Sequence, residues 1–236
     1  MTGPAIEPSK PPEWWRLLPE IANALPLALN FMKPAPKCNA DGRGFPVLVI
    51  PGIMSGDEAT VQLRRALGSS GFVPFGWNQG FNLGLRPGLL GRLEERVREI
   101  ERTFGRKPIL LGWSLGGLFA RALANRIPEK VAMVVTLSSP FSGSPKANRA
   151  WRLYELLNDH PVTEVPEGID FASKPPVPTI AAWTRRDGIV SPESSMGSPE
   201  QSDLQVELEV THFGYGGRSN GVKQVVELLA ANLPAG

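Results

Sequence analysis

The sequence contains very few of the residues that form disulfides or bind metals. Cys38 is the single cysteine among 236 residues, and His160 and His212 are the only histidines. One cysteine excludes a disulfide within the chain and fits a reducing compartment. These three residues are far apart along the chain, so their spacing assembles no metal-ligand cluster and no metal is expected.

The sequence also lacks a large excess of charge of either sign. Its 25 basic and 23 acidic residues leave a formal charge of +2. Nucleic-acid-binding proteins usually carry a larger and more clustered basic excess, so nucleic acid is not an expected partner. A glycine-rich phosphate loop of the Walker or dinucleotide type is missing as well.

No apolar run is long enough to cross a bilayer. The most apolar early segment, Ile21 to Met32, is too short and is interrupted by Pro26. The first residues have no basic start followed by an apolar stretch, so a secretory signal is not expected. We therefore expect a soluble, cytoplasmic protein.

Apolar runs typical of buried strands alternate with amphipathic segments along most of the chain. This alternation predicts an α/β fold with a doubly wound, mostly parallel sheet of about six strands. Strands are expected at 45–52, 72–77, 107–113, 131–140, 177–188 and 204–210, and helices at 57–71, 89–105, 115–128 and 221–233.

Two regions fall outside this alternation. Residues 141–178 separate two strands by far more than a short connection and contain a plausible helix followed by a proline-rich stretch, which indicates a cap or lid. Residues 1–12 are proline-rich and are expected to form a flexible tail. Residues 13–44 are expected to form a helix and a connector packed on the core.

The N-terminal helix allows two interpretations. Apolar residues recur at helical spacing from Trp14 to Leu25. The helix either packs on the body of the protein, or it is an interfacial segment whose Trp14 and Trp15 enter lipid near the substrate entrance, which would make a peripheral membrane contact.

Ser114 lies in the segment GWSLGG, between an apolar strand and a helix. A G-x-S-x-G sequence occurs often by chance, but a strand before it and a helix after it are the context of a nucleophile elbow. Side chains at positions 112 and 116 would collide with the neighbouring chain in so sharp a turn. We therefore predict that Ser114 is a nucleophile.

A serine hydroxyl needs a base, and the chain offers two histidines. His212 directly follows the last strand, where loops reach the ligand-binding edge of such a sheet, whereas His160 lies at the end of the expected cap helix. The base needs a carboxylate to orient it. Asp187 follows the fifth strand, and Asp203 and Glu193 are weaker alternatives.

The order Ser114, Asp187, His212 and the segments VLVIPGIMSG, GWSLGG, TLSSPFSG, WTRRDGIV and EVTHFG resemble the lipase and esterase branch of the α/β-hydrolase superfamily. The resemblance implies that 45–236 form the α/β-hydrolase domain, that the first two strands of the full superfamily fold are absent, and that no cofactor is needed. It also implies an oxyanion hole formed by the backbone N–H groups of Ile53 and Leu115, with Met54 as an alternative donor. Candidate pocket residues are Met54, Trp77, Phe81, Trp113 and Phe141.

The expected function is hydrolysis of carboxylic esters, with lipid or acyl esters favoured over peptides, through an acyl-enzyme on a Ser-His-Asp triad. An acyltransferase on the same residues is the main alternative, although the H-x₄-D signature is absent after either histidine. A non-catalytic binding protein on a hydrolase fold is the third candidate.

Overall fold

The computed structural model describes residues 10–29, 34–158, 161–163 and 169–234. Six parallel strands form one sheet in the order β2-β1-β3-β4-β5-β6. The strands are β1 (Pro46–Ile50), β2 (Val73–Gly76), β3 (Ile109–Trp113), β4 (Met133–Leu137), β5 (Thr179–Trp183) and β6 (Leu204–Glu207). The predicted fold class and all six expected strands are confirmed, and no further strand precedes β1 within the described residues.

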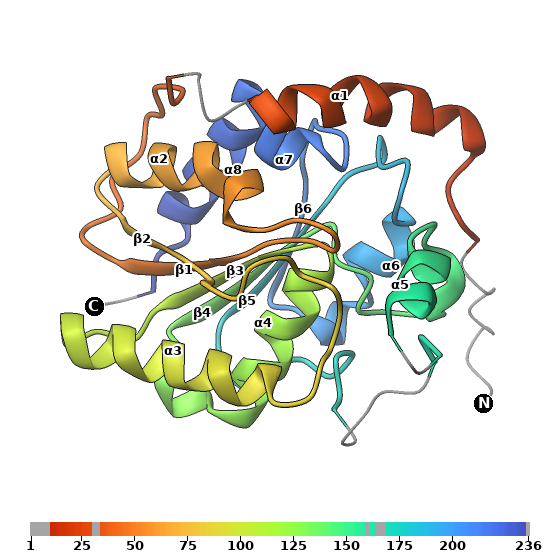
Figure 1. The fold of residues 1–236 in the computed structure, drawn as a ribbon. Helices are drawn as coiled ribbons and strands as arrows, with labels where there is room; N and C mark the ends of the chain where they lie inside the picture. Colours follow the sequence, from red (N-terminus) through yellow and green to blue (C-terminus); the bar gives the residue numbers. More distant parts are fainter. Residues whose placement is uncertain (1–9, 30–33, 159–160, 164–168, 235–236) are drawn as a thin grey trace.

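Helices cover both faces of the sheet (Figure 1). On one face lie α2 (Val61–Ser69), α7 (Gly214–Gly217) and α8 (Ser219–Ala231); on the other lie α3 (Leu89–Phe104) and α4 (Leu115–Arg126). Successive side chains of β1 point to opposite faces, so Val47 and Val49 join one core cluster while Leu48 and Ile50 join the other. A strand buried on both faces must be apolar at every position, which explains the continuous apolar run in the sequence.

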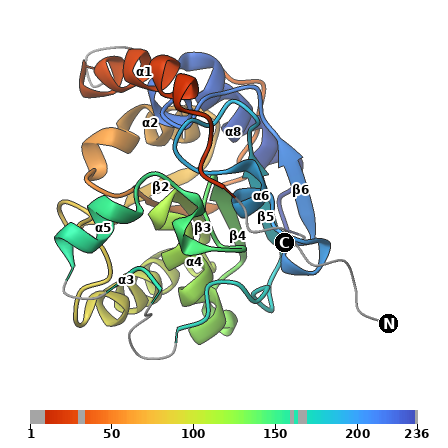
Figure 2. The ribbon, with the colours of Figure 1, turned by 90° about the vertical axis from the view of Figure 1, so that its right-hand side faces the viewer.

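Segment 141–178 connects the carboxyl end of β4 to the amino end of β5. It contains a short 3₁₀ turn, η5 (Pro145–Ala147), and the helix α5 (Trp151–Leu157), which lies on the same side of the molecule as α6 (Pro192–Met196) (Figures 1 and 2). Arg121 of α4 anchors the end of this segment through hydrogen bonds to the carbonyl oxygens of Phe171, Ala172 and Ser173. The structure thus has a helix, α5, in the part of this segment where the sequence predicts one.

The N-terminal helix α1 (Leu17–Leu29), preceded by the 3₁₀ turn η1 (Trp14–Arg16), packs against α7 on the outer side of the molecule (Figure 1). Its orientation differs from that of an ordinary packed helix. Trp14, Leu18 and Ile21 are 68%, 63% and 67% exposed, whereas Glu20 and Asn23 are buried. Glu20 accepts N–H groups of loop backbone and Asn23 bonds to the Thr211 and Arg218 side chains, so these two residues face the body while Leu18 and Ile21 face solvent.

Within the described ranges, no helix combines the length and the hydropathy needed to cross a bilayer. The expected tail falls mostly on residues 1–9, outside the described residues.

Candidate active site

Ser114 occupies a strained turn between β3 and α4. Its backbone angles, φ 54° and ψ −121°, are ones that non-glycine residues rarely adopt, and such strain persists only where the surrounding structure holds it. The backbone N–H of Ser114 donates to the carbonyl of Leu137 at 2.8 Å, which ties the turn to the end of β4. The side chain is nearly buried and borders a cavity.

The neighbouring glycines make this turn sterically feasible. A Cβ at Gly112 would lie 2.4 Å from the carbonyl oxygen of Gly116, and a Cβ at Gly116 would lie 2.3 Å from the carbonyl oxygen of Ile50. At these distances the atoms would overlap, and backbone atoms cannot shift without a large energetic cost. The steric reason predicted for both glycines therefore holds.

His212 and Asp187 are brought together from two loops. The Nδ1 atom of His212 lies 2.8 Å from Oδ2 of Asp187, and both side chains are almost fully buried. The other carboxylate oxygen, Oδ1, accepts the backbone N–H groups of Ile189 and Val190, each at 2.8 Å. Asp187 is thus fixed by its own loop and in turn orients the imidazole.

Burial lowers the pKa of His212, but the charge and hydrogen bond of Asp187, together with the charge of Glu20, more than offset it. The net pKa lies above the usual 6.5 of a histidine. Since Asp187 accepts from Nδ1–H, the neutral ring presents Nε2 as the free basic atom.

The alternative acids lie elsewhere in the fold. Asp203 accepts the backbone N–H of Thr179 at 2.8 Å and pairs with Lys174, and Glu193 lies in the first turn of α6. The alternative base, His160, falls outside the described residues.

Trp113, the residue before the serine, packs against the His212 loop. Its ring lies 5.9 Å from the ring of His212 and 6.0 Å from that of Phe213, measured between centroids. Among the described residues, Ser114 Oγ forms no hydrogen bond to His212. Asp187 and His212 are therefore hydrogen-bonded to each other, and Trp113, which precedes Ser114 in the chain, packs against the His212 ring.

The loop after β1 lies against the serine. A Cβ at Gly52 would be 3.3 Å from Cβ of Ser114, and Ile53 borders the same cavity. The N–H of Met54 donates to the carbonyl of Asn82 at 2.8 Å, which leaves it engaged elsewhere. In the described part of the chain, the N–H groups of Ile53 and Leu115 have no hydrogen-bond acceptor.

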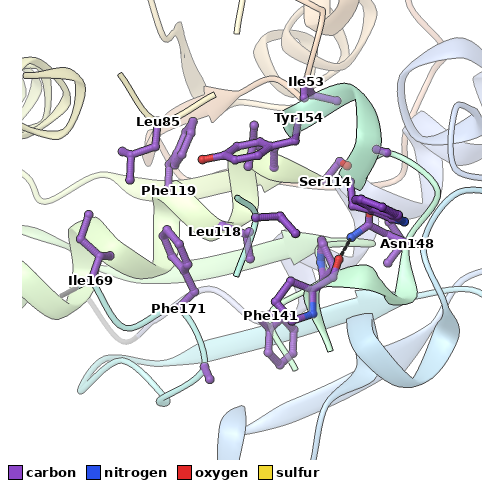
Figure 3. Close-up of a pocket in the computed structure, with 18 of the residues that line it drawn as sticks. Ile53, Leu85, Ser114, Leu118, Phe119, Phe141, Asn148, Tyr154, Ile169 and Phe171 are labelled. Carbon is purple, nitrogen blue, oxygen red and sulfur yellow. Dashed lines mark hydrogen bonds between the residues drawn. The ribbon is translucent and has the colours of Figure 1, made fainter. Parts of the chain in front are cut away.

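A cavity of about 270 Å³ opens beside Ser114. Figure 3 shows Ser114 and Asn148 on one side of it and Leu85 and Ile169 on the other. Most of its lining is apolar and comes from α4 and segment 141–178, including Leu118, Phe119, Phe141, Trp151, Tyr154, Ile169 and Phe171.

Of the five candidate pocket residues, Phe141 alone lines this cavity. Trp77 is buried in the core, where its Nε1–H donates to the carbonyl of Gly80, and Trp113 packs on the His212 loop. Met54 and Phe81 are exposed away from the cavity. These four residues do not line this cavity, whose wall comes mainly from α4 and segment 141–178.

Comparisons with known proteins identify the fold. A family model described as alpha/beta hydrolase fold matches residues 90–159. The monoacylglycerol lipase of Paleococcus ferrophilus superposes with a TM-score of 0.58 at 20% identity, over 82% of this chain and 96% of that one. Lipase B of Aspergillus fumigatus superposes with a TM-score of 0.59 at 19% identity, over 86% of this chain and 56% of that one. The chain has the α/β-hydrolase fold.

Curated relatives of this chain match over short segments. A GPI inositol-deacylase of Kluyveromyces lactis is 40% identical over 68 residues, which are 27% of this chain and 7% of that protein. A biotin biosynthesis bifunctional protein of Teredinibacter turnerae is 38% identical over 47 residues, 20% of this chain and 8% of that protein. The chain thus matches less than a tenth of the length of either relative.

One residue of the candidate site was missed by sequence reasoning. Glu20 of α1 is 1% exposed, and its carboxylate accepts the backbone N–H groups of Gly188, His212 and Phe213. The only signal in the sequence was an acidic residue inside an otherwise apolar helix. Its partners are 168 to 193 residues away, so no local pattern could identify them.

Proposed function

We propose that this chain is a serine hydrolase that cleaves carboxylic esters, with Ser114 as nucleophile, His212 as base and Asp187 as the acid that orients it. The buried hydrogen bond between His212 Nδ1 and Asp187 Oδ2 carries the proposal, because it leaves Nε2 free to accept a proton. The strained turn that holds Ser114 beside a cavity supports the role of nucleophile.

In the proposed reaction, Ser114 Oγ attacks the ester carbonyl carbon while its proton passes to Nε2 of His212. The tetrahedral oxyanion accepts hydrogen bonds from the N–H groups of Ile53 and Leu115. The C–O bond to the alcohol then breaks, and the alcohol leaves with the proton from His212. Water attacks the acyl-enzyme by the reverse proton path and releases the acid.

The chemistry of the cavity favours acyl or lipid esters. Its lining is mostly apolar, as the acyl portion of such an ester requires, and Asn148 supplies a polar group on the Ser114 side (Figure 3). Similar proteins include a monoacylglycerol lipase and a GPI inositol-deacylase by name, which is consistent with acyl-ester chemistry.

The outward side of α1 and the turn before it supports a peripheral contact with a lipid surface. Trp14, Trp15, Leu18 and Ile21 are all more than half exposed, and Arg16 lies beside the Trp15 ring. Apolar side chains of this size with an adjacent cation suit the bilayer interface. Sedimentation with anionic vesicles is expected to capture the wild type and to lose W14S/W15S. Equal capture of both would exclude this contact.

The function is tested by turnover of p-nitrophenyl butyrate. Ser114→Ala should abolish turnover, whereas the control Ser69→Ala, which changes a serine at the end of α2 that is remote from the site, should retain it. Undiminished turnover by Ser114→Ala would refute the mechanism.

Partition of a labelled acyl group between water and added alcohols distinguishes hydrolysis from acyl transfer.

A further inference from the structure

Glu20 joins the two loops that carry the acid and the base. Its Oε1 accepts the N–H of Gly188, next to Asp187, at 3.0 Å and the N–H of His212 itself at 2.7 Å. Its Oε2 accepts the N–H of Phe213 at 2.9 Å. One buried carboxylate thus fixes backbone on both sides of the Asp187–His212 hydrogen bond.

The rest of the inward side of α1 strengthens this attachment. The Asn23 side chain donates from Nδ2 to the Thr211 hydroxyl at 2.7 Å, and its Oδ1 accepts from Arg218. Together, Glu20 and Asn23 contact the residues immediately before, at and after His212. Among the described side chains of α1, Glu20 and Asn23 are buried against the body, whereas Leu18 and Ile21 face solvent.

We propose that Glu20 is a positioning residue for the reaction, which holds the Asp187 and His212 loops in register and places a second negative charge beside His212. The proposal rests on the proposed function. Removal of this carboxylate would free three backbone donors at once, and small displacements of reacting groups are costly in rate.

The charge of Glu20 gives the proposal a readout that simple loss of packing would not produce. In the described structure, the charged groups that act on His212 are Asp187 and Glu20. The nearby phenol of Tyr215 is hydrogen-bonded to Ser138, and burial raises its pKa and keeps it protonated. The negative charge of Glu20 raises the pKa of His212. A neutral residue at position 20 should therefore lower the pKa of His212.

The test is the imidazole NMR titration of the full chain. With two histidines in the sequence, each spectrum has two imidazole Cε1–H resonances, one from each residue. The variant His160→Gln shows which of them belongs to His212. Glu20→Gln should shift the His212 midpoint to lower pH and lower kcat by about 10- to 100-fold with KM little changed. The control Glu13→Gln changes an exposed residue ahead of α1 and should alter neither the His212 midpoint nor kcat. Glu20→Asp should keep the midpoint near that of the wild type.

An unchanged His212 midpoint and unchanged kcat in folded Glu20→Gln would overturn the proposal. If Glu20→Gln does not fold, amide exchange in the wild type decides the matter. The amides of Gly188, His212 and Phe213 should then be strongly protected, and rapid exchange at them would overturn the proposal. Absence of ester turnover in the wild type would refute the proposed function, while the titration would still show whether Glu20 acts on His212.

Discussion

Leu115 contributes to the proposed mechanism through its backbone and not its side chain. It is the first residue of α4, where N–H groups have no intrahelical acceptor, and it directly follows Ser114. This placement suits an oxyanion donor, and each such donor is worth roughly 10²- to 10³-fold in rate.

We expect Leu115→Ala to keep most of the wild-type kcat, because alanine retains the N–H group. Ester turnover of Leu115→Ala and Ser114→Ala, measured side by side, checks this. A loss of 10²-fold or more in Leu115→Ala would mean that the side chain itself supports catalysis.

The pH dependence of kcat/KM follows from the raised pKa of His212. Only the neutral imidazole accepts the serine proton, so activity should rise with pH through a midpoint above 6.5.

Asp187→Asn should move this midpoint to lower pH, since the carboxylate raises the pKa of His212, and should lower kcat by on the order of 10⁴-fold. A midpoint below 6.5 in the wild type would contradict this electrostatic account.

At the scale of elements, Arg121 links the helix after the nucleophile to the end of segment 141–178. Its guanidinium donates to four carbonyl oxygens, those of residues 171, 172, 173 and 201, and lies 4.1 Å from the ring centroid of Phe141. Burial lowers the pKa of Arg121 to about 10, although the nearby charge of Asp170 opposes this change. The side chain thus stays charged at neutral pH.

We expect Arg121→Met to destabilise the protein by roughly 2–4 kcal/mol, because buried carbonyl groups would lose their donors. Thermal unfolding measures the change. Arg102→Met is the matched control, since Arg102 is an exposed residue of α3 that pairs with Glu95. Equal melting temperatures for the two variants would show that Arg121 does not hold the segment.

The N-terminal helix shows which part of an element the sequence could predict. Helical spacing predicted α1 correctly. It did not indicate which side chains face the body, because Glu20 and Asn23 find partners near residues 188 and 211–218. Pairings over such separations leave no trace in local periodicity.

For the molecule as a whole, the sheet was predictable because the buried strands β1, β3, β4 and β5 are almost entirely apolar, and amphipathic helices separate several of the strands. The meeting of the loops that carry Asp187 and His212 followed from the strand ends in a parallel sheet. The cavity wall was not predictable, since segment 141–178 has no regular pattern and folds over the strand ends through contacts such as those of Arg121.

The size of the cavity predicts the acyl preference. A volume of about 270 Å³ lies just below the ~300–1,000 Å³ of most small-molecule pockets, so short acyl chains should fit better than long ones. We expect p-nitrophenyl butyrate to be turned over faster than p-nitrophenyl palmitate. Phe171→Ala should enlarge the cavity and reduce the difference between the turnover rates of the butyrate and palmitate esters. A wild-type preference for palmitate would contradict this account of the cavity.

Covalent labelling by a fluorophosphonate probe, located by peptide mass spectrometry, tests the central claim most directly. The probe reacts with a serine that an adjacent base activates. The account predicts one label on Ser114, no label in Ser114→Ala, and much slower labelling in His212→Asn. Labelling of another serine at the same rate in Ser114→Ala, or no labelling of the wild type, would contradict it.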